Sequence, residues 1–106
     1  MKIIVIEIKI VSNGGVMNPA DLPTLSKRVE EILSYQGWDA LVGISGRMPV
    51  WAYAALTEKC HPAKGVATYE PRSNGLIIVS RHSEEVPGVG EIVPLTGDEV
   101  KVEVEI

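Results

Sequence analysis

The spacing of hydrophobic and polar positions changes several times along this chain, and each change predicts a new element. Residues 2 to 11 are rich in β-branched side chains and alternate from Ile6 to Ile10, which is typical of a strand. A helix is predicted over about residues 22 to 35, with Asp21 as its N-cap and Gly37 as its stop. Its apolar face holds Leu25, Val29, Ile32 and Leu33.

The middle of the chain repeats this strand-and-helix order. Residues 38 to 44 are apolar with little alternation, which indicates a strand buried on both faces of a parallel sheet. Residues 49 to 59 follow as a second helix, with Pro49 in its first turn. Trp51 lies early in this helix, and we expect it to pack in the core rather than to stack on a nucleobase.

The last third of the chain predicts strands only. Residues 64 to 69 and 76 to 80 form a hairpin in this interpretation, because Asn74-Gly75 between them favours a tight turn. A short strand is predicted over residues 91 to 94. Residues 100 to 106 alternate strictly, which predicts an edge strand with one wet face and an antiparallel neighbour.

These elements together predict the α/β class, with a mixed sheet and two helices. At 106 residues the chain is expected to be one domain, residues 1–106, with a single core. No segment is long enough to cross a membrane, and the apolar start is interrupted by Glu7 and Lys9 without a signal-peptide cleavage site. Cys60 is the only cysteine, which with the missing leader predicts a reducing, cytoplasmic location.

The net charge restricts the kinds of partner. A formal charge of -4 and a pI near 5.1 exclude a general nucleic-acid coat, which needs an extended basic surface. A small phosphorylated ligand stays compatible with this charge, because a few arginines around a pocket are enough to bind it.

Two polar loops follow predicted strands. Ser45, Gly46 and Arg47 follow one strand, and Ser12 to Gly15 follow another. Ligands of open α/β sheets collect at the carboxyl ends of strands, and a helix N-terminus attracts anions. We therefore predict that both loops line one anion site, with Ser12, Ser45, Gly46 and Arg47 binding the ligand. The alternative is that both loops are ordinary connectors.

A second group of candidates carries proton-transfer and metal-binding chemistry. It consists of His61, Glu70, Arg72 and His82, and the chain has no other histidine. Imidazole nitrogens and a carboxylate suit a divalent ion such as manganese, and a neutral histidine is also a general base. Because no local histidine motif is present, two ordinary surface histidines are the alternative.

Three segments together resemble a known family. They are Ile44-Ser45-Gly46-Arg47-x-Pro49-x-Trp51, Val66-Ala67-x-Tyr69-Glu70-Pro71-Arg72 and His82-Ser83. The combination is similar to the small ring nucleases of type III CRISPR systems, in the Csx series of accessory proteins. The similarity is strong over residues 40 to 85 and, before them, is limited to the order of elements.

This resemblance implies a small Rossmann-like domain of the CARF type that forms homodimers, or tetramers around the ligand. It implies cyclic tetra-adenylate as the ligand, bound by Ser45 and Arg47. It also implies four catalytic residues, which are His61, Glu70, Arg72 and His82. His61, Glu70 and His82 would hold manganese, although the family more often has aspartate at the position of Glu70. The expected activity is ring cleavage; the alternatives are ring binding without cleavage, and manganese-dependent removal of adenosines from single-stranded RNA 3′ ends.

Overall fold

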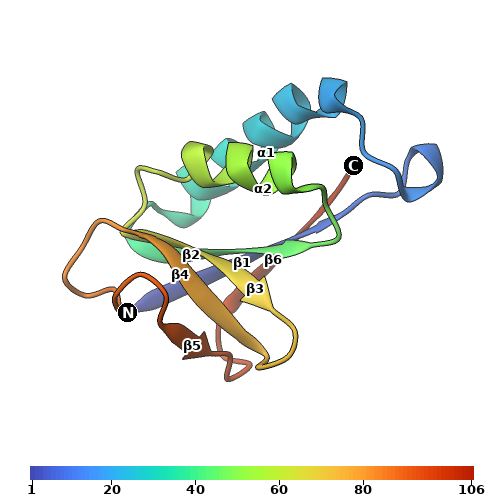
Figure 1. The fold of residues 1–106 in the computed structure, drawn as a ribbon. Helices are drawn as coiled ribbons and strands as arrows, with labels where there is room; N and C mark the ends of the chain where they lie inside the picture. The colour runs from blue at the N-terminus through green and yellow to red at the C-terminus, as the bar shows by residue number, and fades with distance from the viewer.

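The structure is a computed structural model that describes residues 1–106, and it has two layers, helices above and a sheet below (Figure 1). The sheet has six strands in the order β5-β4-β3-β2-β1-β6. Two short 3-10 turns, Asn13–Gly15 and Pro19–Asp21, precede the first α-helix. The helices are α1 (Leu22–Gln36) and α2 (Val50–Lys59). The strands are β1 (Lys2–Lys9), β2 (Ala40–Gly46), β3 (Gly65–Glu70), β4 (Gly75–Arg81), β5 (Ile92–Pro94) and β6 (Val100–Glu105).

The predicted α/β class with a mixed sheet and two helices is confirmed. β1, β2, β3 and β6 are parallel to one another, whereas β4 pairs antiparallel with both β3 and β5. The carboxyl ends of β1, β2 and β3 therefore lie at one end of the sheet, which we call the carboxyl end. Their amino ends lie at the opposite end, the amino end, where β4 finishes.

The prediction for residues 100 to 106 is half wrong. β6 is an edge strand as expected, but it runs parallel to β1, with Ile4 opposite Val100 and Lys9 opposite Glu105. The alternation of polar and apolar residues shows that one face of the strand is exposed to solvent. This is true of parallel and of antiparallel edge strands, so the alternation does not predict the strand direction. The direction is set instead by the point at which the chain joins the sheet, beside the start of β1.

The sheet curls strongly. Only residues 95 to 99 connect β5 to β6, which form opposite edges of the sheet. Such a segment spans about 20 Å at most, whereas the edges of a flat six-stranded sheet lie roughly 24 Å apart. The strands must therefore bend round beneath the sheet, as β4 and β5 do in Figure 1.

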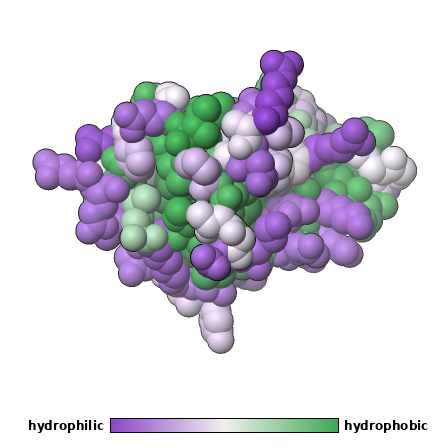
Figure 2. Space-filling view, turned by 90° about the horizontal axis from the view of Figure 1, so that it is seen from below, coloured by the Kyte–Doolittle hydropathy of each residue, from purple (hydrophilic) through white to green (hydrophobic).

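Each face of the sheet has its own core. Ile4, Ile6 and Ile8 of β1 belong to the larger one, beneath residues of both helices. Val5 and Leu41 point to the other face and pack with Leu76 and Ile78 of β4. Figure 2 shows this lower face, where hydrophobic residues gather in the middle and hydrophilic side chains surround them. β1 and β2 are thus buried on both faces, as the unbroken apolar pattern of residues 38 to 44 predicts.

The helices agree with the predicted ranges to within a residue, and Asp21 is the N-cap residue of α1 as predicted, but one expectation about a single residue is wrong. The Asp21 carboxylate accepts a hydrogen bond from the Asn18 N–H at 2.9 Å and makes no side-chain cap on α1. Trp51 is 36% exposed and belongs to neither core, because Ala52 and Leu56 form the buried face of α2. Neither helix is long and apolar enough to cross a membrane.

A carboxylate holds the segment before β6 in place. The Thr96 N–H, helped by the Thr96 hydroxyl and the Gly97 N–H, holds the pKa of Glu99 at about 2 instead of its ordinary 4.5. A carboxylate whose pKa is lowered on folding stabilises the fold fully above its unfolded pKa, and this stability is lost as pH falls through the folded pKa.

We therefore expect Glu99→Gln to lower the melting temperature at neutral pH. The difference from the unmodified protein should shrink as pH falls from about 4.5 toward 2, because both proteins then lack the charge. Thermal unfolding followed by circular dichroism across this range measures it. Parallel melting curves at all pH values would contradict the role given to Glu99.

Candidate functional site

The two predicted ligand loops meet at the carboxyl end of the sheet. Gly14 and Gly15 lie on one side of a hollow of about 620 Å³, and Ser45, Gly46 and Arg47 lie on the other. We call this the carboxyl-end hollow. Ser12 does not line it; its carbonyl accepts the Gly15 N–H at 2.9 Å and closes the turn that places the two glycines. Five of the seven residues of the two loops line the hollow, and Ser12 and Asn13 do not; ligand binding by these residues stays a prediction.

Gly46 is required for the shape of this hollow. It has a φ of +138°, and a Cβ atom there would lie 2.3 Å from the Ile8 carbonyl oxygen. Its own carbonyl accepts a hydrogen bond of 2.5 Å from the Tyr53 hydroxyl, which ties the end of β2 to α2. Burial raises the pKa of Tyr53, although this hydrogen bond opposes the shift.

Sequence reasoning missed two acidic residues in the hollow. Glu7 lies opposite Ser45 on β2 and opposite Glu103 on β6, and all three side chains point away from the helices. Glu7 and Glu103 line the hollow together with Lys9 and Arg47. The alternation of residues 2 to 11 already puts Glu7 and Lys9 on one face of the strand. This pattern could have predicted that charged side chains of the first strand lie beside the ligand loops. The hollow therefore carries two charges of each sign.

Arg47 lies between this hollow and the start of α2. Strand β2 runs through Ser45 and Gly46, and α2 begins at Val50, so Arg47 belongs to the short connection and not to the helix. Its side chain is exposed and forms no ion pair within the chain. The guanidinium is therefore free to bind an anion from solution.

Glu70 and Arg72 lie at the same end of the sheet, in the predicted β3–β4 hairpin. Glu70 ends β3, and its carboxylate accepts the Arg72 N–H at 3.0 Å. Asn74 has a φ of +47°, and its side chain accepts the Tyr69 hydroxyl at 2.9 Å. These contacts fix the turn and leave the Arg72 side chain exposed.

The two histidines meet at the other end of the sheet. His61 follows the end of α2 and His82 follows the end of β4, and their rings contact edge to face with centroids 4.3 Å apart. We call them the histidine pair. A second hollow, of about 530 Å³, opens beside His61 and is lined also by Trp38, Glu58 and Lys59. Two residues 21 positions apart in the sequence are thus brought into contact by the fold.

Two hydrogen bonds determine the tautomer of His82. Its Nδ1 lies 3.0 Å from the Ala63 carbonyl oxygen, which only accepts, so Nδ1 carries the proton. Its Nε2 lies 2.8 Å from the Ser80 hydroxyl and is therefore the acceptor in that bond. Ser80 was not among the predicted site residues, although its spacing of two from His82 places both on one face of the strand.

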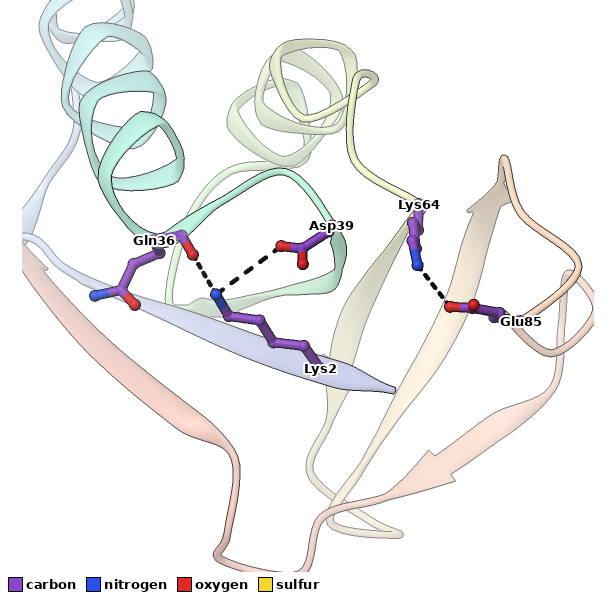
Figure 3. A network of polar contacts seen from close by, with 5 residues as sticks. All are labelled: Lys2, Gln36, Asp39, Lys64 and Glu85. Carbon is purple, nitrogen blue, oxygen red and sulfur yellow. Dashed lines mark hydrogen bonds and ion pairs between the residues drawn. The ribbon is translucent and has the colours of Figure 1, made fainter.

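The lysines near the histidine pair are already paired with carboxylates. Lys64 forms an ion pair of 2.6 Å with Glu85, and Lys2 contacts the Gln36 carbonyl and, at 4.0 Å, Asp39 (Figure 3). Lys59 pairs with Glu30 at 2.8 Å. The arginines without a partner, Arg47 and Arg72, therefore lie at the carboxyl end, whereas Arg81 at the amino end donates to the Val86 and Glu84 carbonyls beside the two imidazoles.

The predicted catalytic set is thus divided between two ends of one chain. Gly65 to Glu70 separates the ends by about 17 Å, at the usual rise of a strand. His61 and His82 come together, but Glu70 does not join them, and no three His, Cys, Asp or Glu side chains form a group that could hold a metal ion. The residues of a single chain therefore do not fit the expected manganese site.

Comparison with known proteins identifies the family. The sequence model of the family described as CRISPR-associated protein (Cas_csx3) matches residues 10–94, and the chain belongs to this family. An uncharacterized protein of Aquifex aeolicus (strain VF5) is 36% identical over 59 residues, which are 56% of this chain and 52% of that protein. The chain therefore spans about half the length of this curated relative. The predicted resemblance is confirmed at the level of a CRISPR-associated, Csx-series protein.

Proposed function

We propose that this protein cleaves cyclic tetra-adenylate, and that the histidine pair carries out the proton transfers. The observation that carries the proposal is the hydrogen bonding of His82. With its proton held on Nδ1 by the Ala63 carbonyl, Nε2 is the accepting nitrogen of the ring; it accepts from the Ser80 hydroxyl, which would turn away when Nε2 takes a proton from the substrate. Such an orientation suits a general base.

In this proposal the ribose 2′-hydroxyl attacks the neighbouring phosphorus. A histidine takes the proton of the 2′-hydroxyl, the bond to the 5′ oxygen breaks, and that oxygen receives a proton. The products are linear adenylates with a 2′,3′-cyclic phosphate. Arg47, the Ser45 hydroxyl and Arg72 would stabilise phosphate charge, which is the contribution that positioned cations make to phosphoryl transfer.

The two ends must come from different molecules for this reaction. Because about 17 Å of β3 separates them, a ring held by Ser45 and Arg47 of one molecule would reach the histidine pair of another. Glu70 and Arg72 would then come with the molecule that holds the ring. A manganese ion would need ligands from more than one chain in this proposal. None of the reaction steps described above depends on the ion.

Mixing two inactive variants tests this arrangement. Arg47→Ala removes the arginine that binds the ring phosphates, and His82→Ala removes the general base. Each variant alone should therefore leave labelled cyclic tetra-adenylate intact. A mixture of the two should recover cleavage, because one supplies the holding end and the other the cutting end. A mixture as inactive as its components would contradict division of the site between molecules, and an intact ring with the unmodified protein at high concentration would contradict the enzyme itself.

One observation favours a second candidate, which is ring binding without cleavage. A single chain separates its free arginine at the hollow from its histidines, so binding needs no contribution from the histidine pair. Calorimetry with the ring would then show tight binding that His61→Ala leaves unchanged, together with no product after long incubation.

A further inference from the structure

A β-bulge in β4 turns Ser80 toward the helices. Ile78 points to the lower face of the sheet, and simple alternation would put Ser80 on that face too. Ile78 lies opposite Ala67 of β3. Ser80 lies opposite the neighbouring Val66, so that Val79 is left without a partner on β3. Because Val66 belongs to the core beneath the helices, Ser80 faces the helices as well. Bulges often re-aim a side chain beside an active site.

The bulge brings Ser80 into contact with His82. The Ser80 Oγ lies 2.8 Å from the His82 Nε2. Since Nδ1 keeps its proton toward the Ala63 carbonyl, Nε2 accepts and the Ser80 hydroxyl donates. A hydroxyl, an imidazole and a carbonyl that orients the imidazole thus follow one another. This order of groups is typical of an activated serine nucleophile.

The position of the imidazole is fixed from several sides. The His82 N–H donates to the Lys64 carbonyl at 2.8 Å. Ala63, which accepts from the ring, is buried, and its own N–H donates to the Cys60 carbonyl at 2.9 Å. The ring of His61 contacts the ring of His82 and limits its rotation. A base held in this way stays within reach of its nucleophile.

We propose that Ser80 is a nucleophile for acyl esters and that His82 is its general base. The Ser80 oxygen attacks the ester carbonyl carbon while its proton passes to the His82 Nε2. The bond from this carbon to the alcohol oxygen then breaks, and the alcohol leaves with the proton. Water, which gives a proton to the same Nε2, attacks the acyl-serine. The carboxylic acid is released, and the proton returns to the Ser80 oxygen.

The exposure of the two residues restricts the kind of ester. His82 is exposed and Ser80 is partly buried. Amide cleavage depends on a closed site that excludes water and stabilises the oxyanion. An open site therefore fits esters with an easily displaced alcohol. The hollow beside His61 contains Trp38, whose ring suits an aromatic leaving group such as a phenol.

Ester cleavage and ring cleavage would use the same base. The His82 Nε2 can take a proton from Ser80 or from a ribose 2′-hydroxyl, but not from both at once. An acyl group on Ser80 would also stand beside Nε2, so acylated protein should not cleave the ring. The inference itself does not depend on the ring reaction, because it is argued from contacts within one chain.

Two serine reagents test the proposal. With p-nitrophenyl acetate the unmodified protein should release a burst of p-nitrophenol as the acyl-serine accumulates. A fluorophosphonate should lose fluoride and form a stable ester that peptide mass spectrometry places on Ser80. Ser80→Ala should remove the burst and this adduct. His82→Ala should slow labelling of Ser80 about 100-fold or more, as expected for a lost general base.

Ser34→Ala is the matched control. The Ser34 hydroxyl donates to the Glu30 carbonyl at 2.8 Å and has no base beside it, so this variant should label like the unmodified protein. The proposal is wrong if Ser80 is labelled no faster than Ser34, or if the burst persists in Ser80→Ala. Ring cleavage is measured separately on the same preparation. An intact ring would refute the proposed function without changing the labelling result.

Discussion

Replacing His82 with alanine should lower the single-turnover rate of cyclic tetra-adenylate cleavage by about 100- to 10,000-fold, the range typical of a lost general acid or base. Ring affinity should not change, since the carboxyl-end hollow lies at the other end of β3. Rapid quenching of labelled ring with excess protein measures the rate, and calorimetry measures the affinity. A rate equal to that of the unmodified protein would exclude His82 from the chemistry.

A second substitution separates catalysis from structure. His82 donates to the Ala63 carbonyl and so helps to hold the segment that enters β3. His82→Asn keeps a donor at a similar position but removes the ring nitrogen that accepts from Ser80. If His82 is catalytic, both variants lose activity while the asparagine variant keeps its melting temperature. If activity follows the melting temperature instead, His82 is a structural residue.

The order of elements was predictable because local patterns determine it. The apolar face of α1 and the unbroken apolar run of β2 report burial directly, and the structure confirms both. Gly37 also ends α1 as predicted, with a φ of +107° that other residues rarely adopt.

Properties that depend on distant segments were not predictable in this way. The direction of β6 follows from the path of residues 95 to 99 beneath a curled sheet, and alternation contains no such information. Trp51 was assigned to the core because a helix must bury a face. In the structure, Ala52 and Leu56 complete that face and leave Trp51 partly in solvent. Cys60 is buried as expected, and burial raises the pKa of its thiol to about 12.

The candidate site divides in the same way. The rule that loops gather at the carboxyl ends of parallel strands correctly joined Gly14 to Ser45 and Arg47. Chemistry alone grouped Glu70 with the histidines, whereas topology separates them, because β3 begins beside His82 and ends at Glu70. The contact between His61 and His82 required the antiparallel return of β4. Residue type therefore predicted the kind of chemistry but not which groups share an end of the sheet.

Gly46→Ala should destabilise the protein by about 3 kcal/mol or more, a cost reached when strained backbone and steric overlap act together. The new Cβ atom would lie 2.3 Å from the Ile8 carbonyl oxygen. That oxygen belongs to β1, which is paired with β2 on one side and β6 on the other and therefore cannot move aside. Denaturant unfolding followed by circular dichroism measures the loss.

Gly97→Ala is the matched control for this prediction. Gly97 also has a positive φ, +95°, but a Cβ atom there would meet nothing within 4 Å. Its substitution should therefore cost only the backbone strain, about 1 to 2 kcal/mol. A Gly46→Ala variant no less stable than Gly97→Ala would show that β1 and β2 separate easily at their carboxyl ends. The carboxyl-end hollow would then be a deformable opening, and the close approach of Gly46 to Ile8 would not be what shapes it.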